Sequence, residues 1–130
     1  MDGRILIVDD EERVRFVLRR ALARMSNGYE VVTAQDGRDA LDKVKATQFD
    51  LIITDLRMPG MGGVKLTEAI KAVDASTVVV WITAYGCHKV RAEARRLSIY
   101  DCLDKPLKVT RIRQIVREAL ESTDGATELD

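Results

Sequence analysis

Residues 50–60 read Asp50-Leu51-Ile52-Ile53-Thr54-Asp55-Leu56-Arg57-Met58-Pro59-Gly60. The apolar run in this stretch is too short for a helix, and Pro59-Gly60 are turn formers, so the sequence predicts a short strand followed by a loop. A continuously apolar strand is typical of a sheet that helices cover on both faces. Asp55 is therefore expected at the end of a buried strand.

Working outward from this strand, four further runs predict strands. The five expected strands are Ile5–Val8, Glu30–Thr33, Leu51–Thr54, Val78–Thr83 and Tyr100–Leu103. The first, third and fourth are almost entirely apolar, so we expect them at the centre of the sheet. The second is short and has polar neighbours, and the fifth alternates between polar and apolar residues. Both patterns are typical of edge strands.

Stretches of helical period separate these runs. Apolar residues recur at helical spacing between Val14 and Met25, after Asp36-Gly37, from Leu66 to Val73, and from Val109 to Leu120. A further helix, Cys87 to Leu97, the fourth in chain order, has a narrow apolar stripe and should be the most loosely held. Strands alternating with helices predict the α/β class, here a single-domain (βα)₅ doubly wound parallel sheet.

Composition narrows the class of protein. The chain has 130 residues, 46% of them hydrophobic and 32% charged, which suits one globular domain. We expect this domain to span residues 1–121, with 122–130 as a disordered tail or the start of a linker. The formal net charge is zero, so no global field directs the protein to nucleic acid or a membrane.

Targeting and cysteine signals point to the cytoplasm. The longest apolar run, Val78–Ile82, is far short of the ~20 residues that a membrane helix needs. Acids follow the first apolar run at once, unlike in a signal peptide. Cys87 and Cys102 form neither a disulfide framework nor a zinc spacing, so we expect free thiols in a reducing compartment.

Polar residues follow the strands at the carboxyl end of the sheet, where ligands bind in open parallel sheets. Asp9 and Asp10 follow the first strand, Asp55 the third, Thr83 ends the fourth, and Lys105 comes after the fifth. Carboxylates massed in this way repel one another unless a cation joins them, which predicts a site for Mg²⁺.

Asp55 is the candidate nucleophile of this set. A carboxylate can attack a phosphoryl group and form an aspartyl phosphate if a metal and a fixed cation neutralise the charge. Mg²⁺ and Lys105 would supply these charges. Thr83 can donate a hydroxyl hydrogen bond to the same group, together with the backbone N–H groups of the loops, at Leu56 and Ala84.

Each of these residues also has an ordinary structural interpretation. Asp9-Asp10 could cap a helix, Asp55 a loop, and Lys105 could be a solvated lysine. Taken singly, each such interpretation is the better one. Taken together they are not, because all would fall by chance at the one end of the sheet where this fold places its sites.

Four motifs occur in a fixed order between about Arg4 and Leu120: 5–11, 50–63, Thr83-Ala84-Tyr85-Gly86, and Leu103-Asp104-Lys105-Pro106-Leu107. In these motifs the chain resembles the CheY-like response regulator receiver domains of two-component signalling. The resemblance implies strand order 2-1-3-4-5 in a flavodoxin-like sheet, and often a cis bond before Pro106.

The resemblance also implies a function. Asp55 would take a phosphoryl group from a sensor histidine kinase or a phosphotransfer protein. Asp10, Asp55 and the carbonyl of Arg57 would hold Mg²⁺, with Asp9 acting through water. Beyond phosphotransfer to its own Asp55 and slow autodephosphorylation, no enzyme activity is expected.

Phosphorylation would change the surface formed by 87–97, 100–103 and 109–120. That surface would control a downstream protein target or an output domain, or form a homodimer. No contact of this chain with nucleic acid or a membrane is expected.

The chain departs from the family pattern in three features. Cys102 stands where the family usually has an aromatic switch residue, so Tyr100, Tyr85 or backbone shifts would have to transmit the signal. Leu97-Ser98-Ile99 replaces a turn of small residues, and Lys108 takes the position of a better helix cap.

Rival classes fit less well. A haloacid dehalogenase-type phosphatase needs a second Asp where Arg57 stands, and a flavodoxin needs a phosphate loop where Asp9-Asp10 stand. A receiver fold that binds partners without phosphorylation is the alternative that Cys102 leaves open.

Overall fold

Five parallel strands form one sheet at the centre of the molecule. The structure, a computed structural model, describes residues 3–25 and 28–129. The strands are β1 (Arg4–Val8), β2 (Glu30–Ala34), β3 (Leu51–Asp55), β4 (Val78–Thr83) and β5 (Asp101–Asp104), in the order β2-β1-β3-β4-β5. The predicted sheet order, with β2 and β5 at the edges, is confirmed.

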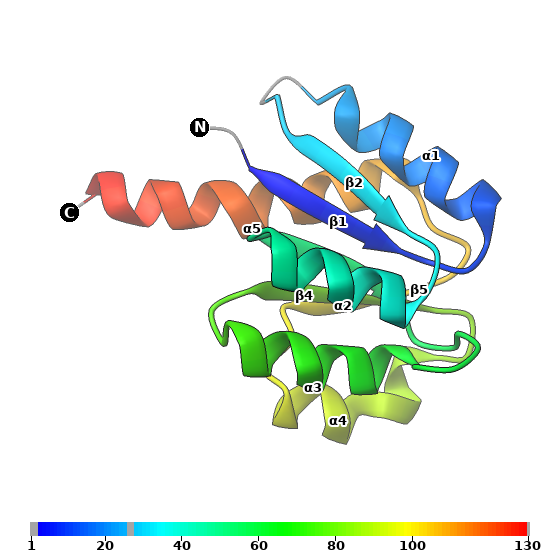
Figure 1. Ribbon diagram of the computed structural model, residues 1–130. Helices are drawn as coiled ribbons and strands as arrows, with labels where there is room; N and C mark the ends of the chain where they lie inside the picture. The colour runs from blue at the N-terminus through cyan, green and yellow to red at the C-terminus, as the bar shows by residue number, and fades with distance from the viewer. Residues whose placement is uncertain (1–2, 26–27, 130) are drawn as a thin grey trace.

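Helices cover both faces of this sheet (Figure 1). They are α1 (Glu12–Ala23), α2 (Gly37–Ala46), α3 (Gly63–Val73), the 3₁₀ helix η1 (Cys87–Val90), α4 (Arg91–Arg96) and α5 (Val109–Leu129). α1 and α5 pack on one face, whereas α2, α3 and the η1–α4 segment pack on the other.

The alternation of side chains along each strand creates the two cores. Ile5 and Ile7 point toward α1 and α5, whereas Leu6 and Val8 point toward α2 and α3. All four side chains are fully buried. Because both faces of the central strands are buried, polar side chains of these strands can reach solvent only near the strand ends. The functional groups therefore lie at an end of the sheet.

The predicted helix over Cys87–Leu97 is split in the structure. Its first residues form η1, and only Arg91–Arg96 are α-helical. Neither segment contains a buried residue; Val90, Ala94 and Leu97 are partly buried against the core. Because its apolar stripe is narrow, this segment buries little surface against the sheet.

The turn before β5 depends on a left-handed backbone conformation at Ser98. Ser98 adopts the left-handed backbone conformation, with φ 52°, between Leu97 and Ile99, which both pack against the core. β5 is expected at Tyr100–Leu103 but lies one residue later, because Tyr100 makes only the opening hydrogen bond, from its N–H to the carbonyl of Val79 (2.7 Å).

The prediction of free thiols is wrong, because Cys87 and Cys102 form a disulfide. η1 begins beside β5, and this brings the two Cα atoms within 5.8 Å of each other, inside the usual range for a disulfide. The two cysteines are 15 positions apart in sequence, so only the path of the chain through α4 and the turn reveals the pairing.

The last helix is longer than the sequence indicates. α5 continues to Leu129, so the backbone of 122–129 is helical where we expected a disordered tail or the start of a linker. The domain boundary at residue 121 stays a prediction. None of the helices within the described ranges is both long enough and apolar enough to cross a membrane.

A buried polar pair links α3 to the sheet. The Trp81 indole Nε1–H donates to the Thr67 hydroxyl (2.8 Å), which in turn donates to the carbonyl of Gly63 (2.7 Å). Both side chains are fully buried. The hydroxyl is therefore the group that satisfies the indole N–H in an apolar layer.

Thr67→Val should destabilise the protein by about 1–3 kcal/mol, because it leaves the buried indole N–H without an acceptor at nearly constant volume. Urea unfolding of this variant, of Trp81→Phe and of the double variant measures the effect. Once Trp81 is Phe, Thr67→Val should lose most of its effect. Equal losses in both backgrounds would contradict the proposed role of the hydroxyl.

Candidate functional site

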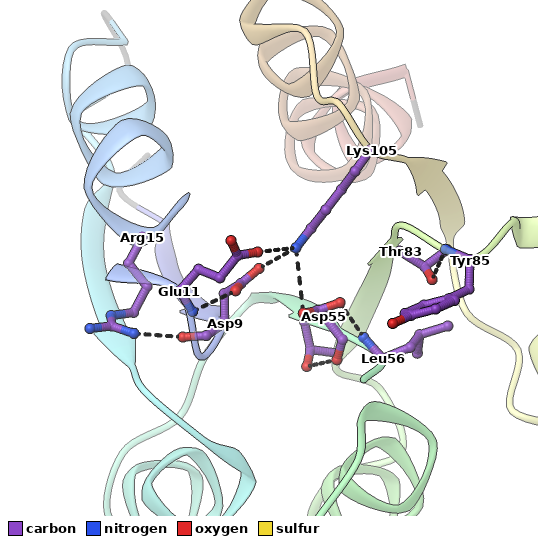
Figure 2. A network of polar contacts seen from close by, with 9 residues as sticks. Asp9, Glu11, Arg15, Asp55, Leu56, Thr83, Tyr85 and Lys105 are labelled. Carbon is purple, nitrogen blue, oxygen red and sulfur yellow. Dashed lines mark hydrogen bonds and ion pairs between the residues drawn. The ribbon is translucent and has the colours of Figure 1, made fainter. Parts of the chain in front are cut away.

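The predicted polar residues meet at the carboxyl edge of the sheet (Figure 2). Asp9 directly follows β1, Asp55 ends β3, Thr83 ends β4, and Lys105 follows β5. Asp9, Asp55 and Thr83 are at most 5% exposed. The sequence prediction that these residues cluster is confirmed by their positions.

Lys105 joins the carboxylates. Its Nζ lies 3.0 Å from Asp9 Oδ2, 3.2 Å from Glu11 Oε1 and 3.4 Å from Asp55 Oδ2. Burial lowers the pKa of Lys105, but the hydrogen bond and charge of Asp9 and the charge of Asp55 outweigh it and raise the pKa above its ordinary value. Lys105 is thus held as a cation. The bond between Lys105 and Pro106 is cis.

Lys105 only partly offsets the negative charge of the two buried carboxylates. Burial raises the pKa of Asp55, and the neighbouring charge of Asp9 raises it further, while Lys105 and the Leu56 N–H lower it less. Burial likewise raises the pKa of Asp9, against the Glu11 N–H and Lys105. One lysine therefore does not fully compensate two desolvated carboxylates, and the edge favours a further cation.

Asp9 is fixed by contacts that the sequence analysis did not assign. Its Oδ1 accepts a hydrogen bond from the Glu11 N–H (2.9 Å), and its backbone carbonyl accepts one from the Arg15 guanidinium (2.8 Å). Glu11 is the N-cap residue of α1 and its side chain makes no capping hydrogen bond, so Asp9 and Asp10 are not the caps of this helix. The position of Glu11 directly after Asp9 and Asp10 could have indicated its part in the site, whereas nothing in the sequence singled out Arg15.

The loop after Asp55 is shaped around its carboxylate. The Leu56 N–H donates to Asp55 Oδ1 (2.8 Å), and the Gly63 N–H donates to the carbonyl of Leu56 (2.9 Å). A Cβ on Gly63 would collide with the Asp55 carbonyl oxygen and with Leu56. Glycine at this position lets the start of α3 lie close against the end of β3.

Thr83 and Tyr85 lie on the other side of Asp55 (Figure 2). The Thr83 hydroxyl oxygen accepts a hydrogen bond from the Tyr85 N–H (3.0 Å). The Tyr85 ring is half-exposed and stacks with the Arg57 guanidinium, whose central carbon lies 4.1 Å from the ring centroid. The loops after β3 and β4 thus touch each other through this cation–π pair. Ala84 is exposed in the second loop.

Three carboxylates can converge on one cation. Oxygens of Asp9, Asp10 and Asp55 all lie within 4.8 Å of one another, and Asp10 is exposed to solvent. An all-oxygen set with an open side fits Mg²⁺, which uses one or two carboxylates and retains waters. The donor set and the uncompensated charge both suit this ion.

The family profile described as "Response regulator receiver domain" matches residues 5–117. The chain belongs to this family. A relative from Bacillus subtilis (strain 168), sporulation initiation phosphotransferase F, is 32% identical over 120 residues, covering 92% of this chain and 95% of that protein. Regulatory protein AtoC of Escherichia coli (strain K12) is 36% identical over 119 residues, covering 92% of this chain but 25% of AtoC.

Solved structures agree with this assignment. Chemotaxis protein CheY4 of Vibrio cholerae superposes with a TM-score of 0.84 at 29% identity, covering 92% of this chain and 100% of that one. This chain spans about a quarter of the length of AtoC but nearly all of the Bacillus relative. Receiver domains act in two-component signalling rather than as classical enzymes, typically bind Mg²⁺ at an acidic pocket, and work with histidine kinases and output domains.

Asp55→Asn should raise the free energy of unfolding at about pH 7 in metal-free buffer. Folding raises the pKa of Asp55 above its ordinary value of 3.8, so the folded state binds more protons and loses stability as the pH rises through this window. The asparagine carries no charge and avoids this loss.

Urea unfolding at several pH values measures the difference between the variant and the wild type. The difference should shrink as the pH falls below 3.8, since Asp55 then is neutral in both states. Asp42→Asn, at an exposed position of α2, is the matched control and should show no such gain. A less stable Asp55→Asn at neutral pH would contradict the interpretation.

Proposed function

We propose that Asp55 is the phosphoryl acceptor of this receiver domain. The observation that carries the proposal is the bridge from Lys105 to Asp9 and Asp55 at the sheet edge. It presents a buried carboxylate beside a fixed cation, and this is the arrangement that phosphoryl transfer needs. The similarity to a protein named as a phosphotransferase over 95% of its length supports the same role.

In the proposed reaction the Asp55 carboxylate attacks the phosphorus of a phosphohistidine. The phosphorus–nitrogen bond breaks, and the imidazole leaves with the electron pair and takes up a proton. Lys105 Nζ, 3.4 Å from Asp55 Oδ2, would pair with an oxygen of the transferred group. The N–H groups of Leu56 and Ala84 would donate to the remaining oxygens.

We assign the metal site to Asp9, Asp10 and Asp55 with the backbone carbonyl of Arg57, and Asp9 would act through a water. Bound Mg²⁺ would neutralise charge on the phosphoryl oxygens. The raised pKa values of Asp9 and Asp55 support this assignment, because they mark negative charge that Lys105 leaves uncompensated. The same residues would catalyse slow loss of the phosphoryl group to water.

Thr83 would convert phosphorylation into a change of surface. Its hydroxyl oxygen accepts from the Tyr85 N–H; on turning toward the phosphoryl group, it would donate there instead. Releasing the Tyr85 N–H would shift the loop that leads into η1. Because η1 and α4 contain no buried residue, a shift of this segment would expose little of the core.

The proposed partners follow from this surface. A sensor histidine kinase or a phosphotransfer protein would supply the phosphoryl group in the cytoplasm. The face of α4, β5 and α5 would control a downstream target or an output domain, or form a homodimer. We place the receiver unit at residues 1–121, and the continuation of α5 would lead into a linker.

Phosphorylation-independent partner binding is the second candidate. Cys102 favours it, since it occupies the usual aromatic switch position and is bonded to Cys87. Such a module would keep the fold and the binding face but would accept no phosphoryl group.

Incubation with phosphoramidate and Mg²⁺ should add a single phosphoryl group, seen by intact mass. Asp55→Asn should show no adduct, because the nucleophile is gone, whereas Asp42→Asn should be modified as the wild type is. Chelation of Mg²⁺ should suppress the adduct strongly. An unmodified wild type would favour the binding module, and an adduct that persists in Asp55→Asn would place the acceptor elsewhere.

Removing the stacked pair should speed the loss of the phosphoryl group several-fold. Arg57 and Tyr85 lie beside the site and would hinder the approach of water to the phosphorus. The double variant Arg57→Asn, Tyr85→Ala tests this by the decay of the adduct mass after removal of the donor.

Arg20→Asn, Phe16→Ala is the matched control, because it removes a cation–π pair on α1. Its decay should equal that of the wild type. Equal decay in all three proteins would rule out shielding by the pair.

A further inference from the structure

The disulfide links the two chain segments that flank the candidate site. Cys87 is the first residue of η1, four residues after Thr83, and Cys102 lies in β5, three residues before Lys105. A hydrogen bond from the Lys105 N–H to the carbonyl of Thr83 (2.8 Å) makes a second link between the same segments. The residues 84–86 are therefore fixed at both ends, by β4 and by the disulfide.

Few other contacts hold η1. The Cys87 N–H donates to Asp104 Oδ1 (2.8 Å), at an exposed position. Val90 is partly buried against the core, and no residue of η1 or α4 is fully buried. The pair of Arg96 with Glu68 is exposed and contributes little. The covalent bond is thus the strongest restraint on this segment.

The disulfide is also within reach of other molecules. Both cysteines are half-buried and line an open hollow of about 380 Å³, together with His88, Arg91 and Tyr100. A disulfide beneath a packed core would be protected from exchange, whereas accessible sulfurs can be attacked. In a reducing compartment such a bond is transient or redox-sensing rather than a permanent staple.

We propose that the Cys87–Cys102 disulfide is a redox site for dithiol reductants that controls how far phosphorylation of Asp55 moves the η1–α4 surface. This inference rests on the proposed function. In the oxidised protein Asp55 accepts the phosphoryl group, but the bond to β5 holds η1 in place. In the reduced protein η1 follows Thr83 and Tyr85, and the surface changes.

A dithiol reductant supplies the electrons and protons for reducing the disulfide by thiol–disulfide exchange. A thiolate of the dithiol attacks one protein sulfur, the sulfur–sulfur bond breaks, and the second protein sulfur leaves as a thiolate and takes up a proton. The second thiol of the reductant then resolves the mixed disulfide. The protein gains two electrons and two protons, and the reductant becomes a disulfide.

Hydrogen exchange followed by mass spectrometry tests the proposal on the full chain, with dithiothreitol as the reductant. Oxidised and reduced protein are each compared with and without phosphoramidate and Mg²⁺. Phosphorylation should change exchange over residues 84–97 several-fold more in the reduced protein than in the oxidised one. Residues 37–46 of α2, on a distant part of the sheet, are the internal reference and should respond equally in both.

Three controls separate the outcomes. Alkylation under denaturing conditions should modify neither cysteine before reduction and both after it; two reactive thiols in the oxidised preparation would overturn the proposal. Cys87→Ser, Cys102→Ser should respond as the reduced wild type does, whether or not dithiothreitol is present. Asp55→Asn should give no response in either state.

The readouts distinguish this proposal from the proposed function. If the phosphoryl adduct forms in both redox states but the change over 84–97 is equal, the redox control is wrong and the acceptor role stands. If no adduct forms in either state, the acceptor role itself fails, and the redox control of it fails too.

Discussion

Two carboxylates buried side by side need a cation between them, and Lys105 supplies it to Asp9 and Asp55. This contact joins the ends of β1 and β3 to the loop after β5, so it ties the centre of the sheet to its edge. Breaking such a buried cluster by removing the lysine would leave uncompensated charge. The geometry of the whole carboxyl edge, from the start of α1 to the loop after β3, is built around it.

The cluster is balanced only in part, and its function depends on this imbalance. Burial raises the pKa of both aspartates despite the lysine, and the charge of Asp9 raises the pKa of Asp55 further. Partly compensated buried carboxylates reduce stability, and such a cost is typical of functional sites. The excess negative charge suits a site that takes up a divalent cation and then a phosphoryl group, and the family membership agrees with that chemistry.

Signal output depends on a different property, namely how weakly the segment after β4 is held. The central strands are buried on both faces and cannot move without disrupting the core. η1 and α4 contribute no buried residue, so their position is set by the 84–86 loop and by the bond between Cys87 and Cys102. Arg57 and Tyr85 couple this loop to the acceptor side of the site. A charge change at Asp55 and a covalent change at the disulfide would therefore act on the same element.

The sequence by itself determined the strands, their central or edge positions, and the set Asp9, Asp55, Thr83 and Lys105. It could do so because period and strand ends are local patterns, and parallel strands bring their ends to one edge. Only the tertiary structure decided which groups bond to one another. Glu11 reaches Lys105, Arg15 reaches the Asp9 carbonyl, and Cys87 meets Cys102 across the turn at Ser98. These pairings depend on the path of loops and on side-chain reach, which no local pattern encodes.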